Sequence, residues 1–409
     1  MFVIIDFLKN RFDLKIPAVF SYYSTRMMLA ALTSFFIVIF LAPFVIRKLT
    51  AFKFGQSIRD EKDECKLLGE LHSKKKNTPT MGGLLILFSM LASMFLFMDL
   101  THVFTLILFL TTISLGLLGA VDDYLKIKRK NTKGLIAKKK LFFQFVCSGI
   151  LALYLFNPAV TAKVQIGKWF SPPVIKEHLS THAKSDELLA ATTVLTLQEY
   201  ASRLYVPFIK EPVLTFAYPF TIILGLFIMF VVTGCSNAVN LTDGLDGLAA
   251  GCSIMVASCL SLIAFISNNI EIASYLNILY VEGSGEIAIY LAAFVGACLG
   301  FLWYNAHPAE IIMGDTGSLA LGGIIGVSAV LLNRELLLGL IGGIFLVEAL
   351  SVVLQVGSFK LRNKKRIFLC APLHHHFEYM GWPETKVVIR FWIIGLLLAI
   401  IGIASLKFQ

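Results

Sequence analysis

Ten long apolar segments are the feature of this sequence that most constrains its fold. A helix needs about 20 apolar residues to cross the hydrocarbon core of a bilayer. The runs are continuous rather than alternating, which favours helices over strands. The sequence therefore predicts an all-α, polytopic membrane protein with ten transmembrane helices. The predicted spans are Met27–Ile46, Met81–Met98, Val103–Val121, Leu141–Phe156, Val213–Val232, Leu248–Ile266, Ile287–Tyr304, Ser318–Leu332, Leu336–Gln355 and Val387–Leu406.

Composition and charge agree with a lipid environment. The 409 residues are 57% hydrophobic and 15% charged, whereas soluble domains have about 45–50% apolar and about 25% charged residues. Ten spans divide the loops into two sets, and the set 47–80, 122–140, 233–247, 305–317 and 357–386 holds 23 of the 36 Lys and Arg residues. Because Lys and Arg of short loops favour the cytoplasmic side, this set is predicted to be cytoplasmic. The net charge of +10 then requires no nucleic-acid partner.

The predicted organisation is one integral membrane domain covering residues 1–409, with an extracytoplasmic insertion at about 157–212. The insertion carries no catalytic motif, and the acidic clusters that could do chemistry all fall in the cytoplasmic loops. A secondary transporter would more often place ionisable groups near the middle of the bilayer. Glu348 is the one acid inside a predicted span, and we expect it to face a partner within the helix bundle.

Two acidic motifs stand at span boundaries. Asp122 and Asp123 close the third span, where two carboxylates can hold a metal ion or act as a base; a polar stop at the membrane boundary is the alternative. Asn305 leads towards Gly314–Ser318, whose glycines can form a nest of backbone N–H groups for an anion at the start of a helix. Asp315 within this segment could carry a metal that bridges to a pyrophosphate, or could simply cap the helix.

A third motif is the polar run after the fifth span. Asn237, Asn240, Asp243 and Asp246 recur at every third position, so a helical or 3₁₀ segment would place them on one stripe. Carboxylates and amides on one stripe suit Mg²⁺, ribose hydroxyls or the edge of a base. A solvated loop that breaks the helix is the alternative.

Histidines and lysines complete the polar loops. His374, His375 and His376 are consecutive, and neighbouring side chains do not easily converge on one tetrahedral zinc ion. Binding of phosphate or sugar oxygens fits them better than zinc, with a plain surface loop as the alternative. Lys74, Lys76 and the lysines of 126–140 are interpreted mainly as residues that set membrane topology.

These residue types indicate a class of reaction before any family is considered. Phosphoryl transfer needs neutralisation of charge and in-line positioning more than covalent chemistry from the protein. Mg²⁺ prefers carboxylates and substrate phosphates as ligands. No GxxxxGK[ST] motif is present, which argues against ATP hydrolysis. A soluble nucleotide donor and a lipid phosphate acceptor could meet at the predicted cytoplasmic loops.

Six ordered motifs carry a resemblance to a known family. They are the segments 78–83, 122–124, 237–247, 313–315, 350–358 and 371–378. The sequence resembles the phospho-N-acetylmuramoyl-pentapeptide transferases (the MraY family), within the polyprenyl-phosphate hexosamine-1-phosphate transferases. The resemblance implies ten helices, a homodimer and a cytoplasmic active site in the bacterial inner membrane. It also implies that UDP-MurNAc-pentapeptide and undecaprenyl phosphate react, with Mg²⁺, to give lipid I and UMP.

The resemblance also assigns residues. Asp315 matches the Mg²⁺ ligand, and Asp122 matches the proposed base that deprotonates the lipid phosphate; an aspartate acting as covalent nucleophile stays open. Lys75, Asp243, Asp246 and Asn305 match residues around the uridine, and His374 and His375 match residues near the phosphates or the sugar. The expected catalytic residues are Asp122, Asp123, Asp315 and His374. The expected substrate-binding residues are Lys75, Asn237, Asn240, Asp243, Asp246, Asn305, His375 and His376.

The sequence also departs from the family pattern. Asn77 stands where glycine is usual, and Ile312 stands where an aromatic residue usually stacks on uracil. Two other functions stay open at this point. One is a sister enzyme that transfers N-acetylglucosamine-1-phosphate to a polyprenyl phosphate, and the other is a secondary transporter. The triple histidine resembles the phospho-N-acetylmuramoyl-pentapeptide branch rather than the sister branch.

Overall fold

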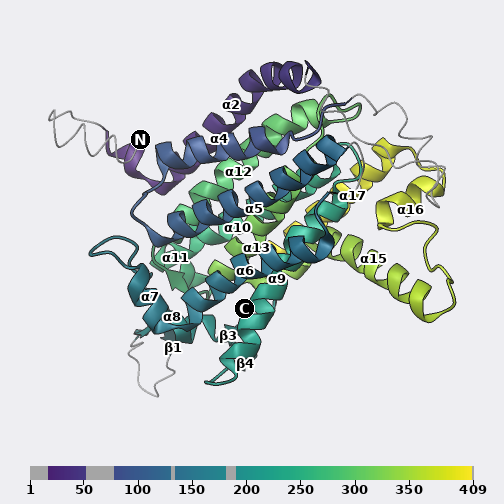
Figure 1. The fold of residues 1–409 in the computed structure, drawn as a ribbon. Helices are drawn as coiled ribbons and strands as arrows, with labels where there is room; N and C mark the ends of the chain where they lie inside the picture. Colours follow the sequence, from purple (N-terminus) through teal and green to yellow (C-terminus); the bar gives the residue numbers. More distant parts are fainter. Residues whose placement is uncertain (1–16, 52–77, 130–133, 181–189, 408–409) are drawn as a thin grey trace.

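Long helices form the body of the protein. The computed structural model describes residues 17–51, 78–129, 134–180 and 190–407. Within these ranges, nine helices are long and apolar enough to cross a membrane, and most of them run alongside one another (Figure 1). They are α2 (Tyr23–Ala51), α5 (Val103–Arg129), α6 (Ala137–Phe156), α9 (Thr221–Thr242), α10 (Leu248–Ser267), α12 (Ser284–Asn305), α13 (Gly314–Leu331), α15 (Gly343–Leu361) and α17 (Glu384–Ser405).

Two predicted spans differ from the helices found there. The predicted span Met81–Met98 corresponds to α4 (Gly83–Phe97), which has only 15 residues, fewer than the about 20 of a typical crossing. Ten crossings therefore stay a prediction. The predicted span Leu336–Gln355 is interrupted, because α14 (Glu335–Ile341) ends at Gly342 and α15 starts directly after it.

The helix α13 lies at the centre of the bundle. Its apolar window is 89% buried, and it packs against α5 and α9, while α12 packs against α2 and α10. A helix surrounded by other helices needs no polar face, which explains why α13 is apolar all round. Neighbouring backbones approach its first turn closely, since a Cβ added at Gly83 of α4 or Gly119 of α5 would collide with the backbone of residues 315–317.

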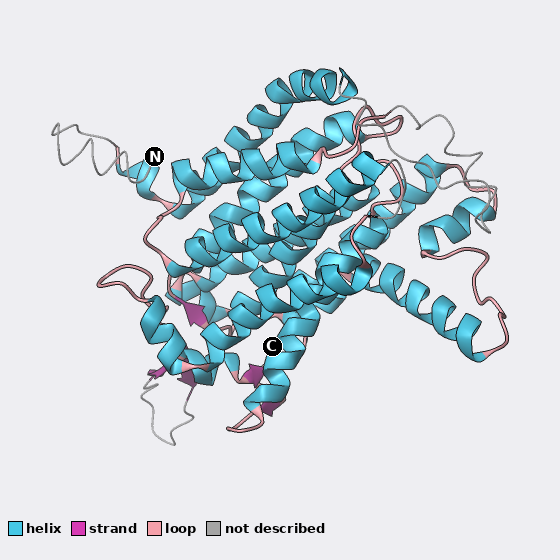
Figure 2. Ribbon diagram, in the orientation of Figure 1, coloured by secondary structure: helices cyan, strands magenta, loops and turns pink. Residues whose placement is uncertain are grey.

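A small unit of helices and strands connects α6 to α9 at one end of the bundle (Figure 2). Its strands form two small antiparallel sheets, of which one includes β5 from the loop before α12. Because β3 and β4 occupy the chain as far as Thr215, α9 begins at Thr221, so the predicted start at Val213 is wrong. The elements are α7 (Pro158–Val164), β1 (Ile175–Ser180), β2 (Ala190–Leu195), α8 (Leu197–Ala201), β3 (Arg203–Leu204), β4 (Leu214–Thr215) and β5 (Tyr280–Val281).

This unit is joined to the central helix. The hydroxyl of Tyr200 donates to the carbonyl of Leu331 at 3.1 Å, and the side-chain amide of Asn333 donates to the carbonyl of Tyr200 at 2.7 Å. Both contacts lie at the C-terminal end of α13, away from its polar first turn. The remaining short helices are η1 (Ala18–Ser21), α11 (Ile270–Tyr275) and α16 (Leu373–Tyr379).

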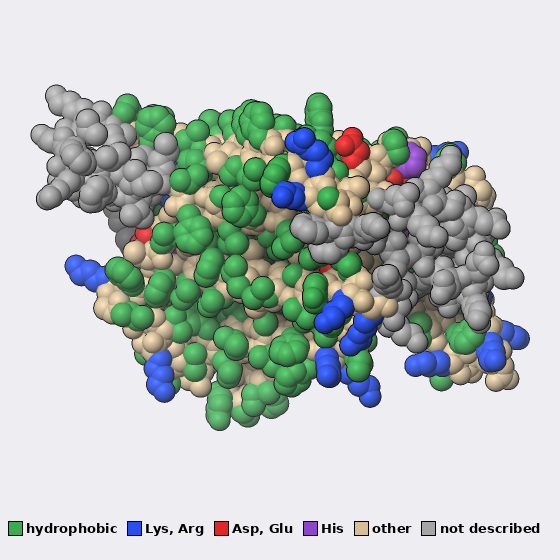
Figure 3. Space-filling model, turned by 45° about the horizontal axis from the view of Figure 1, so that its top comes forward, with side chains coloured by type: hydrophobic (Ala, Val, Ile, Leu, Met, Phe, Trp, Pro, Cys, Tyr) green, Lys and Arg blue, Asp and Glu red, His purple; other side chains and the backbone are tan. Residues whose placement is uncertain are grey.

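The outer surface is strongly apolar. Hydrophobic side chains cover the broad middle of the face in Figure 3, and Lys and Arg gather towards its ends. Many large apolar side chains of the described residues are exposed, among them Phe40, Phe88 and Phe230. A water-soluble protein rarely exposes apolar patches of this extent, whereas a lipid environment requires them. With nine apolar helices in the described ranges, the chain is a multi-pass membrane protein.

Candidate active site

The polar loops converge at one end of the bundle. The N–H of Ile312 donates to the carbonyl of Pro79 at 2.9 Å, which joins the chain before α4 to the chain before α13. The backbone N–H of Gly247 donates to Oδ1 of Asn305 at 3.0 Å, which joins the ends of α9 and α12. These two hydrogen bonds bring three of the polar loops together: 47–80, 233–247 and 305–317.

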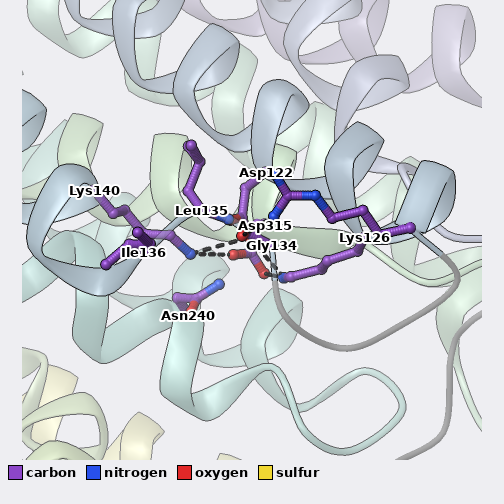
Figure 4. Close-up of a pocket in the computed structure, with 9 residues that line it drawn as sticks. Asp122, Lys126, Gly134, Leu135, Ile136, Lys140, Asn240 and Asp315 are labelled. Carbon is purple, nitrogen blue, oxygen red and sulfur yellow. Dashed lines mark hydrogen bonds and ion pairs between the residues drawn. The ribbon is translucent and has the colours of Figure 1, made fainter.

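Asp122 lies in the most strongly charged part of this region (Figure 4). Its side chain is 1% exposed, and its Oδ2 lies 2.7 Å from Nζ of Lys126 and 3.1 Å from Nζ of Lys140. Its other oxygen accepts the N–H of Leu135 at 2.6 Å. Asp122 therefore has two ammonium groups at one carboxylate oxygen and a backbone N–H at the other.

The same two lysines contact Asp315 from the first turn of α13. Nζ of Lys126 lies 2.9 Å from Oδ1 of Asp315, and Nζ of Lys140 lies 2.5 Å from Oδ2. Each ammonium therefore bridges Asp122 and Asp315, which come from different helices. Without these cations, the mutual repulsion of two largely buried carboxylates would oppose helix packing.

Asp123 has a different environment from its neighbour. Its Oδ1 accepts the N–H of Asp315 at 3.1 Å, and its Oδ2 accepts the N–H of Thr316 at 2.9 Å and the hydroxyl of Thr316 at 2.7 Å. Asp123 thus caps the N-terminus of α13 from another helix, where a carboxylate satisfies free N–H groups and opposes the helix dipole. Gly314, at φ +73°, allows the chain to enter α13 with this carboxylate against its backbone.

Asp123→Asn is expected to lower the free energy of unfolding by about 1–3 kcal/mol, because an amide nitrogen would face donors that the carboxylate now satisfies. Thermal unfolding in detergent would measure the change. Thr316→Val removes only one of the three donors and should have a smaller effect. Unchanged stability of the Asn variant together with lost turnover would instead give Asp123 a purely chemical role.

A cavity of about 540 Å³ opens beside these carboxylates. Asn240, near the end of α9, lines this cavity, and its Nδ2 donates to Oγ of Ser318 at 2.8 Å. Amide, carboxylate, ammonium and backbone groups therefore face one space, which is large enough for a pyrophosphate. The lining residues are Asp122, Lys126, Arg129, Gly134, Leu135, Ile136, Lys140, Asn240 and Asp315.

The polar run 237–246 is divided between a helix and a turn. Asn237 and Asn240 lie on α9, whereas Asp243 and Asp246 follow its end at Thr242. The amide of Asn237 donates to Oε1 of Gln144 at 2.8 Å, inside the bundle. Only part of the predicted stripe thus reaches the cavity, because α9 ends before the two aspartates.

The aspartates after α9 continue the acidic region. Burial raises the pKa of Asp243 well above its usual range, and the nearby carboxylates of Asp315 and Asp123 raise it further. Asp243 is therefore electrostatically close to the carboxylates that line the cavity. The geometry extends the acidic region from the first turn of α13 into the turn between α9 and α10.

A second polar cluster adjoins that turn. Nδ1 of His307 lies 3.1 Å from Oδ2 of Asp246 and 3.4 Å from Oε2 of Glu384. The N–H of Ala309 also donates to Asp246 at 3.1 Å. Neither His307 nor Glu384 was singled out in the sequence, since they lie far from Asp246 along the chain and only folding brings them together.

The three consecutive histidines have three different environments. His374 is fully buried, and its Nδ1 lies 3.1 Å from Oε2 of Glu348. Nδ1 of His375 lies 2.7 Å from Oε2 of Glu378, and Nδ1 of His376 accepts the N–H of Leu369 at 3.2 Å. The three rings therefore have different hydrogen-bond partners, although the rings of His374 and His375 lie in contact, with centroids 4.2 Å apart.

Lys126 and Lys140 are the main residues that sequence reasoning missed. Both were interpreted as topology residues, yet each bridges two carboxylates at the cavity. The sequence offers a partial signal for Lys126, because it follows Asp122 by four residues on one helix face. No local signal marks Lys140, which reaches the site from α6. Lys75 lies outside the described residues.

The carboxylates can also hold a metal ion. Oxygen atoms of Asp122, Asp123 and Asp315 lie within 4.8 Å of one another. Hard oxygen ligands of this kind suit Mg²⁺, which also takes water and substrate phosphates as ligands. Asp122 and Asp315 line the cavity, whereas Asp123 does not and accepts its three hydrogen bonds from the first turn of α13, so Asp122 and Asp315 are the carboxylates that could share a metal ion with a ligand in the cavity. The residues present therefore fit a magnesium ion.

Comparison with known proteins agrees with this chemistry. Residues 105–333 match the sequence model of glycosyl transferase family 4, and residues 75–87 match the first phospho-N-acetylmuramoyl-pentapeptide-transferase signature. The phospho-N-acetylmuramoyl-pentapeptide-transferase of Protochlamydia amoebophila is 65% identical over 407 residues, which cover 99% of both chains. Those of Thermodesulfovibrio yellowstonii and Brachyspira hyodysenteriae are each 43% identical, over 395 and 390 residues that cover at least 95% of each chain. This chain belongs to the phospho-N-acetylmuramoyl-pentapeptide transferase family.

Proposed function

We propose that this protein transfers phospho-MurNAc-pentapeptide from UDP-MurNAc-pentapeptide to undecaprenyl phosphate, which gives lipid I and UMP. The observation that carries the proposal is the joint contact of Asp122 and Asp315 with Lys126 and Lys140 beside one cavity. The family membership and the membrane helices support it. We also propose a homodimer in the bacterial inner membrane, with this site on the cytoplasmic face and the segment 157–212 outside.

The proposed reaction joins two phosphates, so charge is its main obstacle. The lipid phosphate attacks the β-phosphate of the donor, the new P–O bond forms, and the bond to UMP breaks. Mg²⁺, when bound at Asp315, would neutralise negative charge on the pyrophosphate. Lys126 and Lys140 can stabilise the phosphate oxygens from the same side of the cavity, because both ammonium groups already lie at its wall.

Two further roles follow for residues around the cavity. Asp122 can accept a proton from the lipid phosphate, which would make the phosphate oxygen a stronger nucleophile. Asn240 offers an amide to the donor phosphates at the cavity wall. Asp243 and Asp246 lie in the turn after α9 and Asn305 lies at the end of α12, where they can bind the uridine. The roles of Asn237, His375 and His376 in binding stay predictions.

A donor assay tests this proposal. Purified protein in lipid or detergent is supplied with undecaprenyl phosphate and either UDP-MurNAc-pentapeptide or UDP-N-acetylglucosamine, and lipid products are separated. Product from the first donor alone is expected. Addition of EDTA should stop turnover, and restored Mg²⁺ should recover it, because the carboxylates need a divalent cation to bind the pyrophosphate. Turnover of only the N-acetylglucosamine donor would support the sister function instead.

A further inference from the structure

A buried acid on a membrane-spanning helix pairs with a buried histidine. Glu348 lies on α15 and His374 on α16, and both side chains are 0% exposed. In Figure 1, α16 lies beside α15 at the right of the molecule. The expectation that Glu348 faces a partner inside the bundle is confirmed. A charge without a partner would be strongly unfavourable at this buried position on α15. What the pair of Glu348 and His374 does for the protein therefore has to be explained.

The carboxylate of Glu348 holds His374 at two points. One oxygen, Oε1, accepts the backbone N–H of His374 at 3.1 Å, and the other, Oε2, lies 3.1 Å from ring atom Nδ1. A carboxylate accepts hydrogen bonds, so this geometry assigns the proton to Nδ1. The two contacts together fix the position of the residue, the rotation of its ring and its tautomer.

The opposite ring atom of His374 is left for another partner. Nε2 is buried and has no hydrogen-bond partner among the described residues. Leaving such an atom unpaired costs about 1–3 kcal/mol, which a protein rarely retains without a use. A Cβ added at Gly244 would collide with this same atom, so Nε2 lies against the exposed turn that separates Asp243 from Asp246.

We propose that Glu348 is a positioning residue for the transfer reaction and that it acts only through His374. It holds Nε2 against the backbone of Gly244, where the lone pair of Nε2 can accept a hydrogen bond from a sugar hydroxyl of a donor that enters beside this turn. The inference rests on the proposed function, since it assigns the pair to the same site. The proposed site then includes the buried pair of Glu348 and His374, which lies behind the turn after α9.

A double-mutant cycle tests the proposal. Glu348→Gln keeps the shape of the side chain, but its amide can donate to Nδ1 and so reverse the tautomer. We expect kcat to fall by about 10- to 100-fold, the usual range for residues that orient a functional histidine, with the KM for undecaprenyl phosphate unchanged. His374→Gln should reduce kcat at least as far, and the double variant should be no slower than His374→Gln alone.

The control is Ser351→Ala, on the same turn of α15. Ser351 is buried and its hydroxyl donates to the backbone carbonyl of Glu348 at 2.7 Å, so this variant disturbs the helix but leaves the carboxylate. Its kcat should stay within about twofold of the unmodified protein, as for a substitution away from the site. If Glu348→Gln does not fold, Glu348→Asp keeps the charge with a shorter reach and enters the same cycle.

Two results would overturn the inference. The first is a Glu348 variant that turns over at the rate of the unmodified protein, and the second is a double variant whose losses multiply. The unmodified protein, assayed in parallel with both UDP donors, separates these results from failure of the proposed function. Should only UDP-N-acetylglucosamine react, the cycle is measured with that donor and the test of Glu348 is unaffected.

Discussion

Replacing Asp315 with Asn is expected to reduce turnover by at least about 100-fold, while the protein still inserts into the membrane. The carboxylate of Asp315 contacts both Lys126 and Lys140, and it belongs to the group of three carboxylates that could hold a metal ion. An amide of the same shape keeps the packing of α13 but removes the charge that holds these cations. Formation of lipid-linked product from UDP-MurNAc-pentapeptide at saturating Mg²⁺ measures the effect.

The matched control for this variant is Glu310→Gln in the same loop. Glu310 is exposed and lies outside the cavity, so the loss of its charge should leave turnover within about twofold of normal, as for other surface substitutions. Thermal unfolding of both variants separates lost chemistry from lost structure. Near-normal, Mg²⁺-dependent turnover of the Asp315 variant would remove its proposed role.

The second large effect is expected for Lys140→Met. The ammonium of Lys140 lies between Asp122 and Asp315 at 3.1 and 2.5 Å. Methionine has a similar length but no charge, so two carboxylates would be left with one bridging cation, and the donor pyrophosphate would lose a cationic contact. We expect kcat/KM for the UDP donor to fall by about 100-fold, comparable to the loss of one preorganised charge-stabilising group.

Lys139→Met provides the control at the neighbouring position. Lys139 is exposed and lies outside the cavity lining. Lys139→Met therefore tests whether the loss of any positive charge on this basic surface affects turnover. It should change kcat/KM for the donor by no more than about threefold, because exposed charges interact weakly through water. Equal losses at both positions would contradict a specific role for Lys140.

Much of the fold follows from local sequence. Nine of the ten predicted spans correspond to one helix each, and the tenth is divided between α14 and α15, because a continuous apolar run in lipid must satisfy its backbone hydrogen bonds internally. The errors arise where tertiary contacts override that rule. Residues 214–215 pair with another strand, which delays α9, and the central position of α13 explains how the shortest predicted span is the most buried helix.

The candidate site also has features that could be predicted from the sequence and features that could not. The acidic motifs could be recognised from residue type and spacing, since carboxylates at span ends have few structural uses. The separate roles of Asp122 and Asp123 could not be predicted from the sequence, because the two residues are adjacent in the chain but face different partners. Asp122 contacts two lysines, whereas Asp123 caps α13.

The sequence by itself determined that this chain is a membrane protein whose polar motifs lie at helix ends, because both properties depend on which residues are near one another in the chain. Only the tertiary structure decided which of those motifs meet. Lys140 reaches Asp315 from 175 residues away, and Glu348 on α15 contacts His374 on α16. Such contacts depend on how helices pack, and packing is set by the complementary surfaces of whole helices rather than by any local pattern.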